Sequence, residues 1–321
     1  MSELLTVSVA KKRQEAIGIC SFELVDPQGG QMPAFEAGAH IDVHVSDSIC
    51  RQYSLCNDSA ERHRYLIGVL DEPQSRGGSR AMHASVQEGD LLRISQPRNL
   101  FRLDLQAPRS LLLAGGIGVT PILAMAEQLA NAGAQFCVHY SGRTQARMAF
   151  VDHLRGGRLG SHTVLHVDDG PPGQRLDIGG ILASTPRETH IYACGPAGLI
   201  QAVADQARQA GWPADHVHFE YFAAPETSIT NADQPFDVRI SSSGQLITVG
   251  EDESVVAALA RHGIEIPTSC EQGICGSCMT GVLDGKPDHR DMVLSQEERM
   301  RNTQFLPCCS RSRSKLLVLD L

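Results

Sequence analysis

The first hundred residues carry short apolar segments of strand length, separated by turn-forming residues. Three such segments are HIDVHV (40–45), RYLIGVL (64–70) and DLLRIS (90–95). Glycine-containing turns interrupt them at 27–30 (PQGG) and 88–90 (EGD). Polar and apolar residues that alternate between frequent turns are typical of antiparallel sheets. Residues 1–104 are therefore predicted to form a small antiparallel β-barrel with one short helix.

Between residues 105 and 228 buried strands alternate with helices. The predicted strands are SLLLAG (110–115), FCVHYSG (136–142), HTVLHVDD (162–169), HIYACG (190–195) and HVHFEYF (216–222). Helices are predicted over Pro121–Ala132 and about 197–210, because Gly133 and Gly211 stand where C-terminal caps belong. This alternation predicts an α/β domain with a parallel sheet covered by helices.

A polar linker, PETSITNADQP (225–235), precedes a third pattern. FDVRIS (236–241) and QLITVG (245–250) predict a hairpin around Gly244, and Ser254 is expected to cap a short helix that ends at Gly263. A cysteine-rich loop follows, which predicts an α+β domain. The chain is thus expected to be multidomain, with domains at 1–104, 105–228 and 229–321.

The composition narrows the class of protein. Hydrophobic residues make up 42% and charged residues 20% of the 321 residues, which excludes global disorder. Lys and Arg total 28 against 37 Asp and Glu, and the formal charge of −9 argues against nucleic-acid binding. No apolar run reaches the roughly 18 residues that span a bilayer, and the N-terminus lacks a secretory signal. A cytoplasmic protein with no membrane partner and with reduced cysteines is therefore expected.

Five of the ten cysteines lie between Cys270 and Cys309. Three of them follow the spacing C-x4-C-x2-C, namely Cys270, Cys275 and Cys278. This is the spacing of plant-type [2Fe–2S] sites, in which four thiolates hold the cluster. Gly273 and Gly276 give the loop the backbone freedom to curl around it. Either Cys308 or Cys309 can supply the fourth thiolate, whereas zinc favours paired C-x2-C motifs, of which only one is present.

A glycine-rich turn, GGIGVTP (115–121), follows the strand at 110–115. Its glycines, which permit a tight turn and close approach of a pyrophosphate, are Gly115, Gly116 and Gly118. Thr120 can cap the next helix, and Pro121 suits its first position. A second turn, Cys194-Gly195-Pro196, ends a strand of the same sheet, where ligands bind in open α/β folds. Taken alone, the glycine-rich turn at 115–121 is also compatible with an ordinary βα turn. Cys194 alone is also compatible with a buried structural cysteine.

The predicted barrel contains residues suited to a flavin. In Arg51-Gln52-Tyr53-Ser54 the guanidinium can bind a phosphate or flavin edge, the phenol can pack on the ring, and the Ser54 hydroxyl can reach N5. Further flavin contacts are expected from Ile67, Gly68 and Val69. In 75–79 (SRGGS) a nest of N–H groups at Gly77 and Gly78 suits a monophosphate, with Arg76 adding charge and Ser79 capping a helix that begins near Arg80.

Together these motifs resemble the ferredoxin–NADP reductase superfamily. GGIGVTP and CGP are similar to its nicotinamide domain, in which the cysteine of CGP lies near the nicotinamide ring, and R-x-Y-S is similar to its flavin motif. SRGGS resembles the G-R-G-G-S of the FMN-binding branch, with Ser75 replacing the first Gly, so FMN is favoured over FAD. Phe222 falls where the superfamily brings an aromatic near the flavin, although an ordinary linker aromatic is the alternative. The segment around Cys308 resembles the fourth ligand position of the ferredoxin, which leaves Cys309 in the usual apolar position.

The domain order resembles that of phthalate dioxygenase reductases, and the resemblance extends to DHRD (288–291) and the final VLDL. It implies hydride transfer from NADH to FMN, then single electrons through a [2Fe–2S] cluster to a Rieske-type terminal oxygenase. Such systems act on aromatic acids, aryl ethers or quaternary amines. The residues expected at the reacting centre are then Ser54, Cys194 and Phe222.

The sequence is compatible with more than one electron acceptor and leaves the choice of nucleotide to be argued. The acceptor can also be a diiron monooxygenase, and a non-catalytic iron–sulfur carrier or sensor is a further alternative, against which the intact nucleotide and flavin motifs argue. Ser141 and Arg143 follow a strand where NADPH-using relatives hold the 2′-phosphate, whereas Asp168 and Asp169 would oppose that phosphate. NADH is therefore predicted. Nothing in the sequence demands a dimer, so a monomer is expected.

Overall fold

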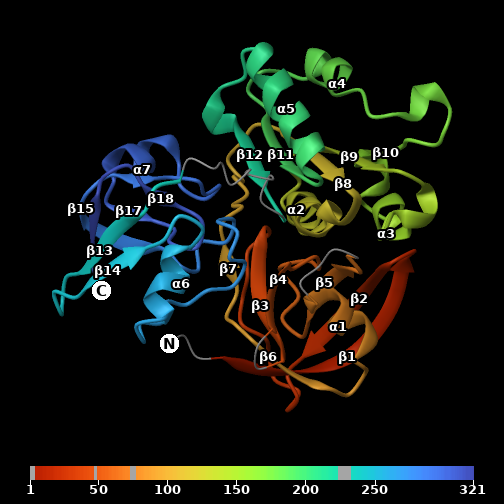
Figure 1. The fold of residues 1–321 in the computed structure, drawn as a ribbon. Coiled ribbons are helices and arrows are strands. Elements are labelled where there is room, and N and C mark those ends of the chain that lie inside the picture. The colour runs from red at the N-terminus through yellow and green to blue at the C-terminus, as the bar shows by residue number, and fades with distance from the viewer. Residues whose placement is uncertain (1–3, 47–48, 73–76, 223–232) are drawn as a thin grey trace. The chain divides into compact units, whose positions relative to one another are not determined.

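The computed structural model describes residues 4–46, 49–72, 77–222 and 233–321. The chain divides into two compact units, Met1–Phe222 and Ala223–Leu321. The first unit contains an antiparallel and a parallel sheet, and the second contains a five-stranded sheet and a two-stranded ribbon (Figure 1). None of the helices in these described ranges combines the length and hydropathy needed to cross a bilayer.

The N-terminal sheet is antiparallel and barrel-like. Its strands are β1 (Leu5–Ala16), β2 (Ile19–Val25), β3 (Ala39–Ser46), β4 (Ile49–Ser54), β5 (Tyr65–Leu70), β6 (Leu91–Ile94) and β7 (Arg98–Asn99), with one helix, α1 (Gly78–Ala84). They pair in the order β4-β3-β6-β1-β2-β5, with β7 beside β3, and a bridge between Leu55 and Ile67 joins the two ends of this order. Alternate residues such as Phe22, Leu24 and Ile41 are fully buried in its core, as strands with one inward face require. The predicted barrel with one short helix is confirmed.

The second sheet is entirely parallel. Its strands are β8 (Ser110–Gly115), β9 (Phe136–Gly142), β10 (Thr163–Val167), β11 (His190–Cys194) and β12 (Val217–Glu220), in the order β10-β9-β8-β11-β12. The helices are α2 (Val119–Asn131), α3 (Val151–Arg155), α4 (Ile178–Ser184) and α5 (Ala197–Gln209). Short 3-10 turns are η1 (Gly116–Gly118), η2 (Gln145–Arg147), η3 (Gly160–His162), η4 (Pro172–Gln174) and η5 (Ala214–His216). This is the predicted α/β layout.

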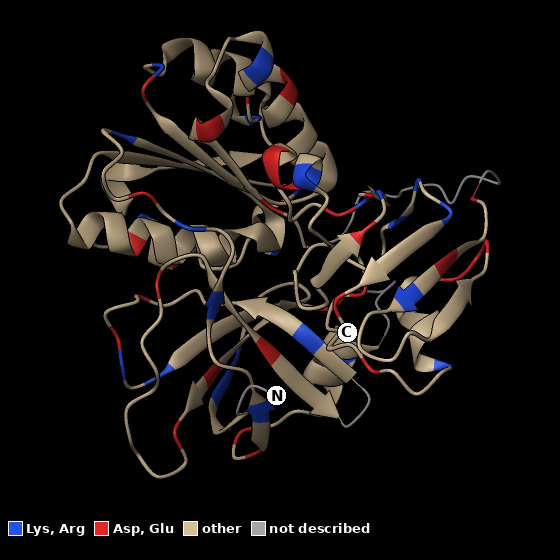
Figure 2. Cartoon of the chain, turned by 90° about the vertical axis from the view of Figure 1, so that its left-hand side faces the viewer, with Lys and Arg blue, Asp and Glu red and all other residues tan. Residues whose placement is uncertain are grey.

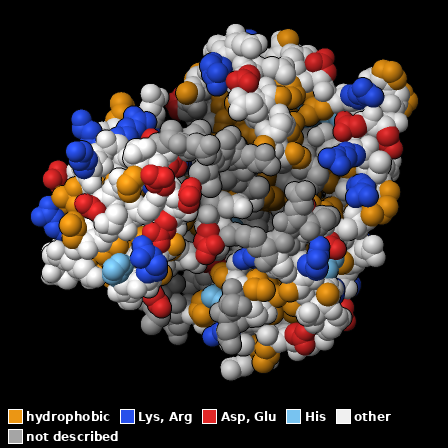
Figure 3. Space-filling model, in the orientation of Figure 1, with side chains coloured by type: hydrophobic (Ala, Val, Ile, Leu, Met, Phe, Trp, Pro, Cys, Tyr) orange, Lys and Arg blue, Asp and Glu red, His pale blue; other side chains and the backbone are white. Residues whose placement is uncertain are grey.

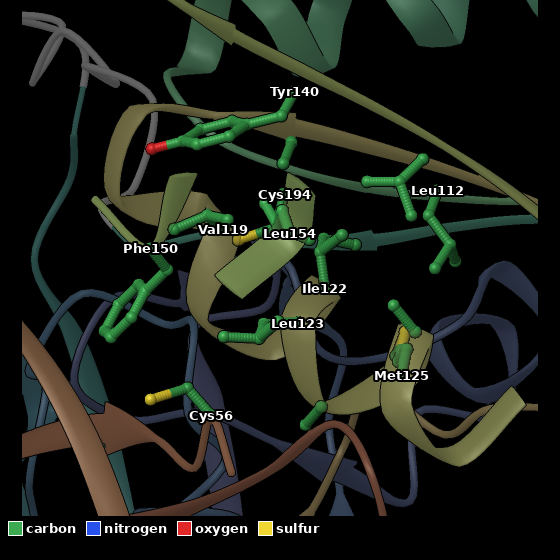
Figure 4. Close-up of a cluster of buried hydrophobic side chains, with 14 of the residues drawn as sticks. Cys56, Leu112, Val119, Ile122, Leu123, Met125, Tyr140, Phe150, Leu154 and Cys194 are labelled. Carbon is green, nitrogen blue, oxygen red and sulfur yellow. The ribbon is translucent and has the colours of Figure 1, made fainter. Parts of the chain in front are cut away.

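Helices cover both faces of the parallel sheet, so the central strand β8 is buried at all six positions. Leu112 and Ala114 pack against α2, whereas Leu111 and Leu113 pack in a separate core with α4 and α5. Figure 4 shows part of the α2 core, with Ile122 and Leu123 beside residues of the sheet. Cys56, which follows β4, belongs to the same core, so the barrel and the parallel sheet share buried contacts within this unit.

Two expected helix starts are wrong in detail. α2 begins at Val119 after Gly118, and the hydroxyl of Thr120 donates to the carbonyl of Ile117 at 3.1 Å instead of capping the helix. α1 begins at Gly78 after Gly77, and the Ser79 hydroxyl accepts from the Glu72 N–H at 3.2 Å. Neither helix has a side-chain cap, and each starts at a tightly packed glycine, since Gly118 lies against the backbone of Cys194 and Gly78 lies against the side chain of Arg51.

The second unit is α+β. Its strands are β13 (Phe236–Ile240), β14 (Leu246–Val249), β15 (Thr280–Asp284), β16 (Pro287–Asp288), β17 (Gln304–Phe305), β18 (Arg311–Ser312) and β19 (Leu316–Leu319), and its helices are α6 (Val255–Ala260) and α7 (Gln296–Arg301). The sheet order is β14-β13-β19-β15-β17, so the last strand pairs between β13 and β15. The predicted hairpin turns at Gly244 with a φ of 72°, and the Ser254 hydroxyl accepts from the Ala257 N–H, as expected of a cap.

Charged residues of both signs occur in both units (Figure 2). On the face shown in Figure 3, cationic and anionic side chains of the described residues are interspersed. The acidic surplus of the sequence is therefore dispersed along the chain. Of the two expected domain boundaries, the first falls between β7 and β8, and the second falls among residues that the structure does not describe, so both remain predictions.

Candidate functional site

Four cysteine thiols converge in the second unit. Cys270, Cys275 and Cys278 lie in the loop between α6 and β15, and Cys308 lies shortly after β17. Cys270 hydrogen-bonds with Cys275 and Cys308, and Cys278 also hydrogen-bonds with Cys308. The four thiols therefore form one continuous set of contacts, in the order Cys275, Cys270, Cys308 and Cys278.

The loop aims backbone N–H groups at these sulfurs. The N–H of Gln272 donates to Cys270 Sγ at 3.3 Å, and that of Ser277 donates to Cys275 Sγ at 3.4 Å. Gly273, with a φ of 73°, makes the turn possible, and a Cβ atom there would lie 2.3 Å from the Sγ of Cys309. Hydrogen bonds from Cys275 and Cys308, together with those from the loop, lower the pKa of Cys270 and favour its thiolate.

This arrangement fits a two-iron cluster, which takes two thiolates on each iron. Within the described ranges, no three His, Cys, Asp or Glu side chains are placed to hold a single metal ion. A single zinc ion would need all four thiols around one centre. Of the two candidates for the fourth ligand, Cys308 contacts Cys270 and Cys278, whereas Cys309 contacts Cys308, and its thiol reaches the Leu306 carbonyl at 3.7 Å.

In the first unit, β4 presents the expected flavin residues. Arg51 packs over the start of α1, where a Cβ atom at Gly78 would lie 2.4 Å from its Cγ. Gly77 has a φ of 88°, which favours glycine at this approach. The phenolic oxygen of Tyr53 is buried and lacks a hydrogen-bond partner among the described residues, so a polar group of a cofactor fits there. Gln52 instead donates to Asp42 on β3 at 3.0 Å.

The remaining predicted flavin residues divide into three groups. Ser75 and Arg76 lie outside the described residues. Ile67 and Val69 are buried in the barrel core, so only their backbone is available to a cofactor. Gly68 lies beside α2, because a Cβ atom there would be 2.8 Å from the methyl group of Thr120.

Glu220, which no sequence motif predicted as a site residue, lies beside two of the predicted reacting residues. The Ser54 hydroxyl donates to Glu220 Oε2 at 3.0 Å, and Glu220 on β12 pairs in register with Cys194 on β11. Burial raises the pKa of Glu220 to about 8, although the Ser54 hydrogen bond opposes this shift. Burial, and next the nearby Glu220, raise the pKa of the Cys194 thiol well above its usual range. The site therefore holds a protonated carboxyl and a neutral thiol at neutral pH.

The sequence offered one signal for Glu220, an acidic residue at the end of an aromatic strand and two positions before Phe222. That signal could not be interpreted alone, because its partner Ser54 lies 166 residues away in the sequence. Phe222 is 39% exposed at the end of the first unit.

The two predicted nucleotide turns pack directly on each other. A Cβ atom at Gly118 would lie 2.3 Å from the carbonyl oxygen of Cys194, and one at Gly195 would lie 3.0 Å from the Cα of Gly115. Gly116 takes a φ of 54°, and Pro196 directly precedes α5. The glycines thus bring the carboxyl ends of β8 and β11 into backbone contact, at the sheet edge where such folds bind ligands.

The residues predicted to bear on nucleotide choice share the neighbouring edge. Arg143 and Asp168 are both exposed, just beyond β9 and β10. The N–H groups of Asp168 and Asp169 donate to the carbonyls of Gly142 and Arg143 at 3.0 and 3.2 Å. Ser141 donates its hydroxyl to the Ala114 carbonyl at 3.1 Å, so it is tied to β8.

Comparisons with known proteins agree with this geometry. An oxidoreductase NAD-binding domain matches residues 112–205, and a 2Fe-2S iron-sulfur cluster binding domain matches residues 238–313. The vanillate O-demethylase oxidoreductase of Pseudomonas putida is 50% identical over 319 residues, which cover 99% of this chain and 100% of that protein. A solved structure of phthalate dioxygenase reductase, described as modular for electron transfer from pyridine nucleotides to [2Fe-2S], is 41% identical with a TM-score of 0.74, covering 99% of this chain and 98% of that one.

The chain belongs to the phthalate dioxygenase reductase family. Membership in that family confirms the predicted fold classes, the oxidoreductase activity and the cofactors NADH, FMN and [2Fe–2S]. It also confirms a terminal oxygenase as the electron acceptor, as expected from the reductase components among its relatives. A further similarity is to an intact type IV self-sufficient cytochrome P450 monooxygenase, 38% identical with a TM-score of 0.89, covering 99% of this chain and 41% of that longer one.

Proposed function

We propose that this phthalate dioxygenase reductase family member passes electrons from NADH to the terminal oxygenase of an aryl-ether O-demethylase. The observation that carries the proposal is full-length similarity to a vanillate O-demethylase oxidoreductase at 50% identity, against 41% for phthalate dioxygenase reductase. A methoxylated aromatic acid is then the substrate class of the partner oxygenase.

The proposed cluster ligands are Cys270, Cys275, Cys278 and Cys308. Support comes from the contacts among these four thiols and from the loop N–H groups that stabilise negative charge on sulfur. Cys309 is assigned to the wall of the site, because its sulfur lies against Gly273.

The proposed flavin site combines Arg51, Tyr53, Gly77 and Gly78 with the backbone of β5. When bound, FMN accepts the two electrons of a hydride together and releases them singly, which NADH and the cluster cannot do. Arg51 supplies a cation beside the glycine turn before α1, and the unpartnered Tyr53 hydroxyl supplies a polar contact. Arg76 and Ser79 remain predicted phosphate contacts.

Ser54, Glu220 and Cys194 are proposed to shape the reacting centre. The Ser54 hydroxyl is oriented by Glu220, and the neutral carboxyl and thiol avoid fixed charges beside the hydride path. Phe222 is proposed to shield this centre from solvent.

At the nucleotide edge, the pyrophosphate is proposed to lie against Gly115, Gly116 and Gly118. Behind these glycines, α2 is held by Thr120 and Pro121. The opposite turn is formed by Gly195 and Pro196. Asp168 is proposed to favour NADH by facing the ribose hydroxyls, while Arg143 lies beside it and Ser141 stays bound to β8. Asp168→Ala should then raise kcat/KM with NADPH relative to NADH.

A haem monooxygenase is a second candidate acceptor. The self-sufficient P450 monooxygenase gives the higher TM-score, 0.89 against 0.74, although only 41% of that chain is covered. A diiron monooxygenase remains the third alternative from the sequence.

Reconstitution tests the proposal. The purified holoprotein, NADH and a purified Rieske-type vanillate demethylase oxygenase should release formaldehyde from vanillate in proportion to NADH consumed. The same reductase with a P450 or a diiron hydroxylase should give at most about a tenth of that rate. Equal or faster turnover with either would assign the acceptor differently.

We further propose that the chain works as a cytoplasmic monomer without nucleic-acid or membrane partners, because its acidic composition and its use of NADH fit that setting. Sedimentation velocity at micromolar concentration should give a single species of about 35 kDa, against the chain mass of 34.7 kDa.

A further inference from the structure

A column of three histidines lies on β11, on β12 and on the turn η5 before β12, beside the proposed reacting centre. His190 Nδ1 and His218 Nε2 are 3.2 Å apart. The ring of His190 also stacks on His216 with centroids 4.2 Å apart, and the ring of His218 stacks on Tyr192 at 4.6 Å. The rings are thus in continuous contact across two neighbouring strands.

This column faces the same side of the sheet as Glu220. Side chains two positions apart on a strand share a face, so His218 and Glu220 lie together on β12, as do His190, Tyr192 and Cys194 on β11. Register pairs Tyr192 with His218 and Cys194 with Glu220. The backbone separation of His218 and Glu220 is about 6.6 Å, which one water molecule between the side chains can bridge.

The proposed reaction needs a route for a proton. Oxidation of NADH to NAD+ delivers a hydride, which carries two electrons and one proton. The electrons leave one at a time through the cluster to the oxygenase, so one proton per NADH remains and has to reach solvent. Ser54 and Glu220 are the first oxygens placed to receive it, and Ser54 is buried, so a proton on its hydroxyl needs a further group to reach solvent.

We propose that His218 and His190 conduct this proton from Glu220 to solvent. In one concerted step Ser54 takes up the proton left by the hydride and passes its own to Glu220, Glu220 passes its own through water to His218, and His218 accepts on one ring nitrogen while the other donates to His190. His190 then releases a proton at the partly exposed end of the column. Every group ends in its starting protonation state once the chain resets, and no charge accumulates. This inference rests on the proposed function, since only a one-electron acceptor leaves the proton behind.

The charges around the column suit this role. Exposed Asp104 and Asp215 lie near its outer end, where carboxylates attract the departing proton. Burial, and next the neighbouring histidine, lower the pKa of His218 to about 4 and also lower that of His190. Both rings are therefore neutral at neutral pH, with one donor and one acceptor nitrogen each. At the inner end Glu220 faces Ser54 and Cys194, neither of which is charged.

Infrared spectroscopy of the oxidised, FMN-loaded protein at rest tests the relay without turnover. The carbonyl band of protonated Glu220 is identified by its loss in Glu220→Gln, and its shift is followed after mixing with D2O. Exchange at Glu220 should be at least tenfold slower in His218→Phe, which keeps an aromatic ring against Tyr192. His190→Phe should slow exchange similarly.

Two further variants make the result decisive. His166→Phe removes a histidine from another His–His pair of the same sheet and should exchange like the wild type. His218→Gln keeps a hydrogen-bonding side chain that cannot relay a proton, and should be as slow as His218→Phe. Wild-type exchange in His218→Phe, or in His218→Gln alone, would overturn the relay, because water rather than the imidazole would then carry the proton. No oxygenase is present, so a failure of the proposed O-demethylase function would show in reconstitution and not here.

Discussion

Glu220 shows how one side chain can depend on a residue from a distant part of the chain. Its carboxyl is neutral at pH 7 because burial disfavours the anion more than the Ser54 hydroxyl favours it. A neutral carboxyl can donate a hydrogen bond, which a carboxylate cannot. Burial therefore decides the protonation state of this group, and the hydrogen bond from β4 limits how far its pKa is raised.

Removing the hydrogen bond from Ser54 should raise the pKa of Glu220. Ser54→Ala takes away the contact that lowers the pKa of Glu220, so the pKa should rise above about 8. Infrared titration of the carbonyl band in the FMN-free protein measures the shift directly. A pKa that falls in Ser54→Ala would mean that another group stabilises the protonated form.

The fourth cluster ligand gives a second prediction at this scale. Cys308→Ser should abolish the visible absorption of the [2Fe–2S] centre, whereas Cys309→Ser should largely keep it, because Cys308 contacts Cys270 and Cys278. Absorption spectra with iron and sulfide counts on both purified variants make the comparison. The opposite pattern would assign the ligand to Cys309.

At the scale of elements, the start of α2 depends on the contact between two backbone turns. Gly118→Ala would place a methyl group 2.3 Å from the Cys194 carbonyl, so the turn would have to move. We expect a loss of about 1–3 kcal/mol in the free energy of unfolding, as for overpacked sites, together with weaker NADH binding. Gly198→Ala in α5 is the matched control, because nothing lies within 4 Å of the added atom. It should be neutral or gain up to about 1 kcal/mol, measured by urea unfolding.

A histidine pair on β9 and β10 should make the first unit sensitive to acid. His139 Nδ1 lies 2.9 Å from His166 Nε2, and burial, and next His166, lower the pKa of His139 from 6.5 to about 4. Between pH 6.5 and about 4, His139 is therefore protonated in the unfolded chain but neutral in the folded chain. Stability should be full above pH 6.5 and should fall as the pH drops toward 4, by at most about 1.4 kcal/mol per pH unit for this group. His139→Gln should show a shallower fall in unfolding free energy over that range, and an unchanged slope would assign the acid sensitivity elsewhere.

The elements themselves were largely predictable from the sequence, and their boundaries less so. The apolar run at 110–115 matches β8 and HIYACG closely matches β11, because buried parallel strands leave a continuous hydrophobic signal. The start of α2 was misplaced because a polar side chain was expected to cap it, whereas contact with Cys194 sets it. The role of Glu220 was not predictable, since it requires β4 and β12 to meet.

At the scale of the whole molecule, the two units are proposed to carry different steps of electron transfer. The proposed flavin and nucleotide residues lie in Met1–Phe222, and all four proposed cluster ligands lie in Ala223–Leu321. The FMN-loaded Cys308→Ser protein, which lacks the cluster, should therefore still reduce ferricyanide with NADH at close to the wild-type rate, since that small oxidant can draw electrons from the flavin. Reduction of cytochrome c and of the terminal oxygenase should drop at least tenfold. Equal losses with both acceptors would show that the first unit depends on the cluster.

The pairing of β19 also bears on how the protein is made. Leu316–Leu319 pairs between β13 and β15, so the sheet that supports the cysteine loop cannot close until residue 319 has been synthesised. The first unit has by then left the ribosome and can already be folded, since domains generally fold as units from the N-terminus. A message cut short before residue 316, or proteolysis at that point, would leave a chain able to consume NADH without passing electrons onward. Such a fragment would reduce oxygen at the expense of NADH. Because β19 lies at the end of the chain, premature termination would then do more harm than the loss of oxygenase activity alone.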